Sequence, residues 1–187
     1  MAWARIISAI RGGCLVLCGI AGITGVAQAS STQVDIPHTH AAASAEERLL
    51  AIHNAERARL GLPKLVWNPR LAADAQGWAS QLLARGAFEH ASPSERRGRG
   101  ENLWMGTADA WEIEGMVDMF LEERRYFREA AFPDISLTGN WTDVGHYSQI
   151  VWRDTREVGC ALDSGNGMDV LVCRYFPTGN VSGELPY

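Results

Sequence analysis

Gly145-His-Tyr-Ser-Gln-Ile-Val-Trp152 places a histidine inside a run that is mostly apolar or aromatic. Two further apolar stretches follow it, residues 157–163 and 168–176, with Ser164-Gly165-Asn166-Gly167 between them. Two such stretches around a glycine-containing turn predict a β-hairpin. The predicted helices all precede this hairpin, so the order of elements favours helices packed on an antiparallel sheet.

Three helices are predicted ahead of the hairpin. Ser44-Ala-Glu-Glu47 has the pattern of a capping box and predicts a helix to about residue 60. Asn68-Pro69 opens a second helix, which ends at Gly86. A third is predicted over residues 110–127, where apolar side chains recur on one helical face. The intervening residues 87–106 are predicted to be a loop that leads into a short strand.

The N-terminal 29 residues have the composition of a signal peptide. Arg5 and Arg11 precede an apolar run, and Ala27-Gln28-Ala29 offers small residues for cleavage after Ala29. We therefore expect residues 1–29 to be removed, 30–43 to be a flexible lead-in and 44–187 to be the folded domain. The chain would then be secreted, extracellular or, in a bacterium, periplasmic, with no membrane span in the mature part.

Charge and cysteine content narrow the function classes. Without its signal peptide the chain has 15 basic and 22 acidic residues, a net charge of −7. Such a surface is a poor match for nucleic acid, so no nucleic-acid partner is expected. Cys160 and Cys173 are the two cysteines that remain after cleavage, and in an exported chain such a pair is expected to form a disulfide.

Four polar residues occur where the pattern does not require an ionisable group: His90, Glu101, Glu123 and His146. On the predicted third helix, Glu123 lies at the edge of the apolar face, whereas Glu122 points to solvent. Two imidazoles and two carboxylates together could hold a divalent metal or perform acid–base chemistry. The alternative is a buried hydrogen-bond network that fixes loops to the helix. Sequence spacing alone does not bring the four together, so from the spacing the hydrogen-bond network is the favoured interpretation.

The other histidines have simpler interpretations. His53 lies on the inner side of the first predicted helix and is interpreted as a core histidine. His38 and His40 belong to the lead-in, where we expect no defined metal site.

Two long segments resemble the signatures of the CAP superfamily, which unites cysteine-rich secretory proteins, antigen five and pathogenesis-related one proteins. They are residues 145–155 and Leu171-Val-Cys-Arg-Tyr-Phe-Pro-Thr-Gly-Asn-Val181. Gly100-Glu-Asn102 and Phe120-Leu-Glu-Glu-Arg-Arg-Tyr126 are similar to two weaker motifs of the same superfamily. The resemblance covers residues 46–187, and the C-terminal part is most similar to the plant pathogenesis-related one type.

This resemblance implies an α+β fold, a three-layer α-β-α sandwich with a central antiparallel sheet. It implies a cavity tetrad of His90, Glu101, Glu123 and His146, with Gln149 lining the cavity. The two histidines would hold zinc or another divalent metal, the segment around His146 would be a short helix, and the Cys160–Cys173 pair matches a family disulfide. No catalytic residue is assigned.

Three functions follow from the resemblance. The leading one is a non-enzymatic binder, with a sterol or fatty acid as ligand or with a role in defence or host interaction. The second is a metal-dependent hydrolase or protease, in which Glu101 or Glu123 would activate water on a metal held by the histidines. The third is a precursor of a C-terminal signalling peptide released by a cut before Pro177.

Overall fold

A computed structural model describes residues 43–187, so the predicted signal peptide and all but the last residue of the lead-in lie outside the described residues. The elements, in chain order, are α1 (Ala45–Arg59), β1 (Val66–Trp67), α2 (Pro69–Arg85), α3 (Pro93–Arg96), β2 (Gly100–Thr107), α4 (Ile113–Leu121), the 3-10 helices η1 (Glu122–Tyr126) and η2 (Trp141–Asp143), α5 (Gly145–Ile150), β3 (Glu157–Gly165) and β4 (Met168–Phe176). Within this part of the chain, no helix combines the length and apolar character needed to cross a membrane.

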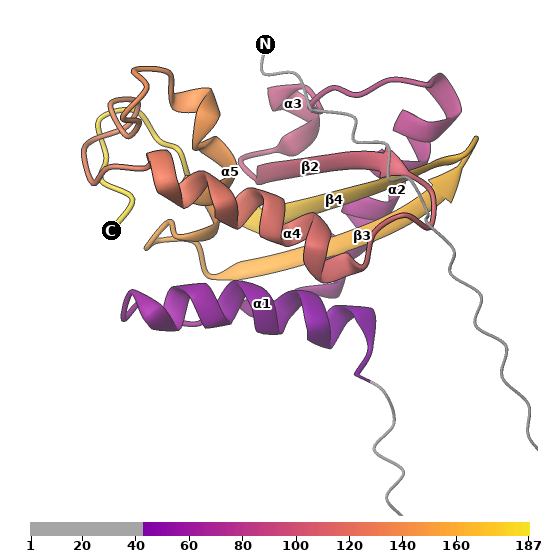
Figure 1. Ribbon diagram of the computed structural model, residues 1–187, viewed down its shortest axis with the longest axis horizontal. Coiled ribbons are helices and arrows are strands. Elements are labelled where there is room, and N and C mark those ends of the chain that lie inside the picture. Colours follow the sequence, from indigo (N-terminus) through magenta and orange to yellow (C-terminus); the bar gives the residue numbers. More distant parts are fainter. Residues whose placement is uncertain (1–42) are drawn as a thin grey trace, which may run out of the picture. The chain divides into compact units, whose positions relative to one another are not determined.

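The four strands form one sheet in the order β1-β3-β4-β2, which leaves β2 at an edge (Figure 1). The predicted hairpin is confirmed, because β3 and β4 pair antiparallel around the turn at Asn166-Gly167. β2 also pairs antiparallel with β4, with Glu101 opposite Arg174. The predicted antiparallel sheet is confirmed for β2, β4 and β3, and the two-residue β1 adds a parallel pairing with β3 at the edge. Such a pair needs a crossover connection, and α2 lies in the chain between these strands.

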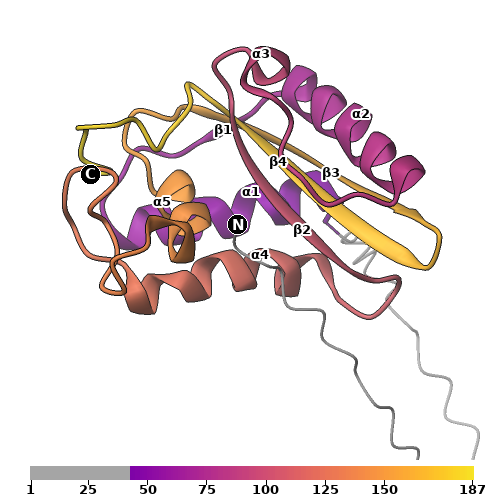
Figure 2. The same cartoon turned by 90° about the horizontal axis from the view of Figure 1, so that it is seen from above.

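Helices cover both faces of the sheet, which confirms the three-layer α-β-α arrangement (Figure 2). α2 packs on one face, where Ala75, Trp78 and Leu82 meet Val170 and Val172 in one apolar core. α1, α4 and α5 lie on the other face around a second core, which includes Met116, Val117, Ile150, Leu171 and Tyr175. Successive residues of β4 contribute to opposite cores, as the period of two along a strand requires.

Most predicted helix ends are confirmed. Ser44 and Glu47 form both bonds of the capping box, Asn68 caps α2, and Gly86 ends it with a left-handed φ of 60°. The third helix is shorter than predicted, because the chain tightens into η1 after Leu121. Such tightening is common in the last turn of an α-helix. The short strand predicted at the end of residues 87–106 is confirmed as β2, which is longer than predicted, and the loop before it contains the short helix α3.

A buried hydrogen-bond chain connects α1 to α5 through the core. His53 is fully buried, with Nδ1 2.7 Å from the Leu49 carbonyl and Nε2 2.9 Å from the Tyr175 hydroxyl. Since a carbonyl only accepts, Nδ1 carries the proton and the Tyr175 hydroxyl donates to Nε2. Asn102 Nδ2 in turn donates to the Tyr175 oxygen at 3.2 Å and to the His146 carbonyl at 3.1 Å. The interpretation of His53 as a core histidine is therefore confirmed.

A second link from α1 is the guanidinium of Arg57, which is fully buried. It donates to the backbone carbonyls of Pro63 (2.7 Å), Ile150 (2.9 Å), Trp152 (2.8 Å) and Thr155 (3.2 Å). Burial lowers the pKa of Arg57 to about 10, so the side chain remains charged at neutral pH. Three of these carbonyls follow directly after the turn that carries His146, so Arg57 fixes the exit of α5.

Acid should destabilise the protein through His53. Burial lowers the pKa of His53 from 6.5 to about 4, so between these values the unfolded chain binds a proton that the folded chain excludes. This contribution to stability is complete above pH 6.5 and falls by up to about 3 kcal/mol as the pH approaches 4. The His53→Gln variant should lose less stability than wild type between about pH 7 and about pH 4.5 in urea unfolding. Equal losses in the two proteins would contradict this assignment.

Removing the Arg57 guanidinium should destabilise the fold severely. Arg57→Met leaves several buried carbonyls without a donor, and each such group costs about 1–3 kcal/mol. We expect a loss of at least about 3 kcal/mol in the free energy of unfolding. Arg70→Met, at an exposed position of α2, is the matched control and should change stability by less than about 0.5 kcal/mol. A similar small effect at both positions would refute the role of Arg57.

Candidate functional site

The four residues singled out from the sequence form two histidine–carboxylate pairs. His90, on the loop between α2 and α3, has Nδ1 2.5 Å from Glu101 Oε1 on β2. His146, on α5, has Nδ1 2.5 Å from Glu123 Oε1 on η1. A carboxylate accepts, so in each pair the histidine donates from Nδ1.

The His90 pair runs from the surface to the interior. The His90 side chain is 54% exposed, whereas that of Glu101 is fully buried. Glu101 Oε1 also accepts the backbone N–H of Ala91 at 3.1 Å, and Oε2 lies 2.5 Å from Arg174 Nη1. Oε1 therefore accepts two hydrogen bonds, whereas Oε2 has the Arg174 charge beside it as an ion pair that lacks hydrogen-bond geometry.

The His146 pair is held by backbone instead. Glu123 Oε2 accepts the N–H groups of His146 and Tyr147, both at 3.0 Å, in the first turn of α5. The Phe120 ring stacks on the imidazole of His146, with centroids 4.7 Å apart. The choice of Glu123 over Glu122 agrees with this geometry, because the Glu122 side chain is 65% exposed and pairs with Arg125.

α1 supports the elements that carry the second pair. Glu56 is buried and accepts from Arg124 of η1 at 3.0 Å and from the Tyr147 hydroxyl of α5 at 2.8 Å. Burial alone would raise the pKa of Glu56, but hydrogen bonds from Arg59 and Tyr147 bring that pKa below its usual value. The charged Glu56 thus ties η1 and α5 to one point on α1.

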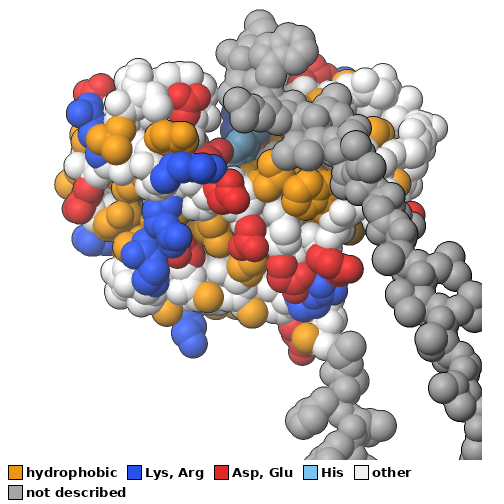
Figure 3. Space-filling view, viewed as in Figure 1, with side chains coloured by type: hydrophobic (Ala, Val, Ile, Leu, Met, Phe, Trp, Pro, Cys, Tyr) orange, Lys and Arg blue, Asp and Glu red, His pale blue; other side chains and the backbone are white. Residues whose placement is uncertain are grey.

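Both pairs attach to the same end of the edge strand β2. Glu101 holds His90 on the face covered by α2, and the next residue, Asn102, bonds the His146 carbonyl on the other face. Neighbouring residues of a strand point to opposite faces, so the two histidines approach this edge from opposite sides of the sheet. Figure 3 shows exposed histidine surface on this side of the molecule, beside acidic and apolar side chains.

In each pair Nε2 is the ring nitrogen that has no hydrogen-bond partner among residues 43–187. An imidazole that donates from Nδ1 keeps its lone pair on Nε2, which is the form that binds metals. Both histidines therefore have the tautomer of a metal ligand, with a carboxylate behind each ring.

Gln149 has a structural position. It is buried, its Oε1 accepts the N–H of Gly179 at 2.9 Å, and its Nε2 donates to Thr155 Oγ1 at 3.1 Å. The side chain also packs on Gly100, where a β-carbon would collide with it. Gln149 thus joins α5 to β2 and to the segment after β4.

Another group of potential ligands does not suit a metal. Among the described residues, His53, Cys160 and Cys173 bring one ligand atom each within 4.8 Å of one another. However, the predicted disulfide is confirmed, with an S–S distance of 2.08 Å, so neither cysteine is a thiolate. Both nitrogens of His53 are also engaged in the hydrogen bonds described above.

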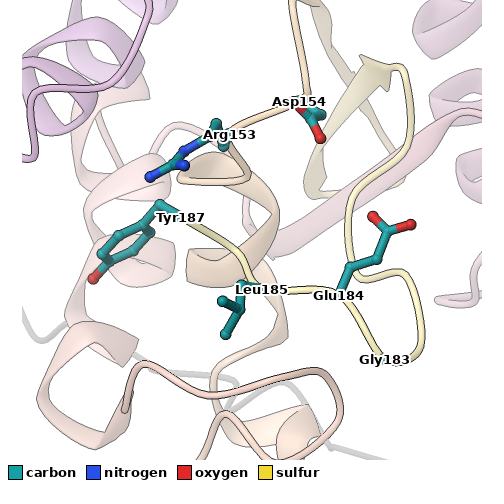
Figure 4. A pocket seen from close by; sticks show the side chains of 6 residues that line it. All are labelled: Arg153, Asp154, Gly183, Glu184, Leu185 and Tyr187. Atoms are coloured by element: carbon teal, nitrogen blue, oxygen red, sulfur yellow. The ribbon is translucent and has the colours of Figure 1, made fainter.

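The residues after β4 are bonded into the fold. Arg153 N–H donates to the Pro186 carbonyl at 2.6 Å, Phe132 N–H to Glu184, and Gly179 N–H to Gln149. A hollow of about 390 Å³ lies beside this segment, lined by Arg153, Asp154, Gly183, Glu184, Leu185 and Tyr187 (Figure 4). None of His90, Glu101, Glu123 and His146 lines this hollow, and no histidine–carboxylate pair lies among its lining residues. We therefore place the candidate site at the two histidine pairs.

Sequence reasoning missed the partner of Glu101. Arg174 is a buried charge in the apolar run of β4, and its side chain is 3% exposed. The criterion that selected the four residues, an ionisable group in an apolar pattern, would have selected Arg174 as well.

Comparison with known proteins agrees with the fold and the motifs. The family model described as the cysteine-rich secretory protein family, CAP, matches residues 50–175. Pathogenesis-related protein 1A of Nicotiana tabacum is 36% identical over 153 residues, which cover 81% of this chain and 86% of that protein. Pathogenesis-related protein 1 of Arabidopsis thaliana is 34% identical over 139 residues, covering 74% and 80%.

Solved structures share the fold at lower identity. The crystal structure of NaASP2 with Zn²⁺ has a TM-score of 0.65 at 23% identity, covering 76% of this chain and 84% of that one. Venom allergen-like protein 4 of Schistosoma mansoni has a TM-score of 0.61 at 24% identity, covering 78% and 94%. Together with the family match over most of the described residues, these findings show that the chain belongs to the cysteine-rich secretory protein family, CAP.

Proposed function

We propose that this chain is a binding protein that holds a divalent metal ion, zinc or a similar one, between His90 and His146. The observation that carries the proposal is the shared geometry of the two pairs, since each imidazole donates from Nδ1 to a carboxylate and presents Nε2. This carboxylate–histidine arrangement fixes the ring and raises its basicity toward a metal.

The donor set fits such an ion in part. Neutral imidazole nitrogens are good ligands for zinc. Two protein ligands are fewer than the three or four of most zinc sites, so water or a ligand would complete the coordination. The crystal structure of NaASP2 with Zn²⁺ supports the idea that this fold can accommodate the ion.

The engagement of both carboxylates favours binding over hydrolysis. A water-activating base needs an oxygen that can accept a proton from water. Glu101 is buried against Arg174 and Ala91, and Glu123 accepts two backbone N–H groups besides His146. The two carboxylates are therefore better suited to orienting the histidines than to accepting a proton from water.

The biological setting is inferred from the relatives. Several similar proteins bear the name pathogenesis-related protein, so we place this chain in defence or host interaction as a secreted protein. A sterol or fatty-acid ligand stays a prediction. Release of a C-terminal peptide before Pro177 would break the bonds that hold residues 178–187 in the fold, so it is disfavoured here.

Loss of either histidine should abolish the metal site. In the purified protein, His90→Ala and His146→Ala should each remove saturable Zn²⁺ binding in isothermal titration calorimetry, because one imidazole alone holds the ion poorly. The control is His38→Ala/His40→Ala, which changes histidines outside the described residues and should leave that binding intact. Binding that survives in both single variants, or that disappears only in the control, would rule out this site.

The carboxylate behind His146 should tune affinity without being a ligand. Glu123→Gln keeps the shape but weakens the bond to Nδ1, so Zn²⁺ affinity should fall about 10–100-fold. Glu122→Gln alters the neighbouring, solvent-facing residue of the same turn and should leave affinity unchanged. Equal affinities of the two variants would mean that Glu123 does not orient His146.

A further inference from the structure

A chain of ion pairs, buried at Glu101 and Arg174 and partly exposed at Asp74 and Arg99, continues behind His90 into the α2 layer. Glu101 Oε2 lies 2.5 Å from Arg174 Nη1, and Arg174 Nε lies 3.2 Å from Asp74 Oδ2 on α2. Arg99, which follows α3, closes the chain with Nη1 2.8 Å from the same Asp74 oxygen. The charges alternate in sign from Glu101 to Arg99, and Glu101 and Arg174 are both within the interior.

Sheet register explains why Arg174 reaches Glu101. The two residues are direct partners across the antiparallel β2–β4 ladder, so their side chains emerge side by side on the α2 face. On the other side of Arg174 the partner is Gly159 of β3. A β-carbon at Gly159 would collide with the backbone at the start of α2, so α2 packs directly onto this strand and brings Asp74 within reach.

The two histidine pairs differ in what holds the carboxylate. Glu123 is held by two backbone N–H groups of α5, which no substitution of a side chain removes. Glu101 depends on Arg174 for its second oxygen. A buried carboxylate that loses its only cationic partner takes up a proton or turns toward other donors. Either change would release Nδ1 of His90.

We propose that Arg174 is a positioning residue for His90: its charge beside Glu101 Oε2 keeps Oε1 on Nδ1 of the imidazole, so that Nε2 is the ring nitrogen left for a ligand. Asp74 supports this role by fixing the other side of the guanidinium. The consequence for metal affinity rests on the proposed function, whereas the orientation of His90 does not. Arginine suits this position because its delocalised guanidinium lies within ion-pair distance of two carboxylates, 2.5 Å from Glu101 and 3.2 Å from Asp74.

Zinc titration of paired variants tests the proposal. Arg174→Met should lower Zn²⁺ affinity at least about tenfold. If Arg174 acts through Glu101, this loss should vanish in a Glu101→Gln background and persist in full in a Glu123→Gln background. Losses of equal size in both backgrounds would show a general effect on the fold and overturn the proposal, as would no loss in the single variant.

Milder variants keep the test valid if Arg174→Met does not fold. Arg174→Lys keeps the positive charge and should lose less Zn²⁺ affinity than Arg174→Met. Where Arg174→Met cannot be measured, the affinity of Arg174→Lys should lie between those of wild type and Glu101→Gln. Asp74→Asn removes only the outer support of the guanidinium and should cause a smaller loss in the same direction. Wild-type affinity in both milder variants would overturn the proposal.

A metal-free measurement separates this inference from the proposed function. Nitrogen-15 NMR of the histidine rings at mildly alkaline pH should show wild-type His90 mainly as the Nδ1–H tautomer, and the Arg174 variants should shift toward Nε2–H. His146 should keep its tautomer in all of them. If wild type binds no Zn²⁺, the proposed function fails, and this measurement alone decides the role of Arg174. An unchanged His90 tautomer in the Arg174 variants would overturn the proposal that Arg174 positions His90.

Discussion

The buried guanidinium of Arg57 is the interaction on which the arrangement of this domain depends. The end of a helix leaves carbonyl groups without intrahelical partners, and the residues after α5 have no strand to satisfy theirs until β3 begins. Arg57 supplies donors to three of these carbonyls from a helix that lies far away in the sequence. Arginine is the side chain with enough donors in a rigid fork for this task. The charge is stabilised by carbonyl dipoles, at a position where water is excluded.

The histidine pairs are arranged within that frame. α1 positions α5 through Arg57 and Glu56, and through the chain from His53 to Asn102 it also reaches β2. His146 and the strand that carries Glu101 are therefore related through one helix that contributes no residue to the site. This explains why residues so far apart in the sequence attach to one end of the sheet edge.

Local signals predicted the elements better than they predicted the partners. Helix caps and tight turns involve only a few neighbouring residues, so they can be predicted from the sequence, as at Ser44, Asn68 and Asn166-Gly167. The end of α4 was missed, since the apolar periodicity continues to Phe127 and does not distinguish an α-helix from the 3-10 turn that ends it. The pairing of each histidine with a particular glutamate could not be read from spacing, because it joins residues of separate elements, His90 of a loop with Glu101 of β2 and His146 of α5 with Glu123 of η1. The resemblance to the family pointed to the four residues but not to Arg174.

The burial of the two pairs bears on what the site does. In each pair the carboxylate is less exposed than its histidine, so the negative charge lies inside and the ring lies at the boundary with solvent. Glu101 has a full positive charge beside it in Arg174, whereas Glu123 accepts only from neutral backbone amides and from the His146 ring. A cation bound at Nε2 would place positive charge one imidazole away from each carboxylate. That charge would compensate Glu123 more than Glu101, because Glu101 is already paired. If the proposed metal binds, this asymmetry would make the His146 pair the half of the site in which metal binding and folding stability are most strongly coupled.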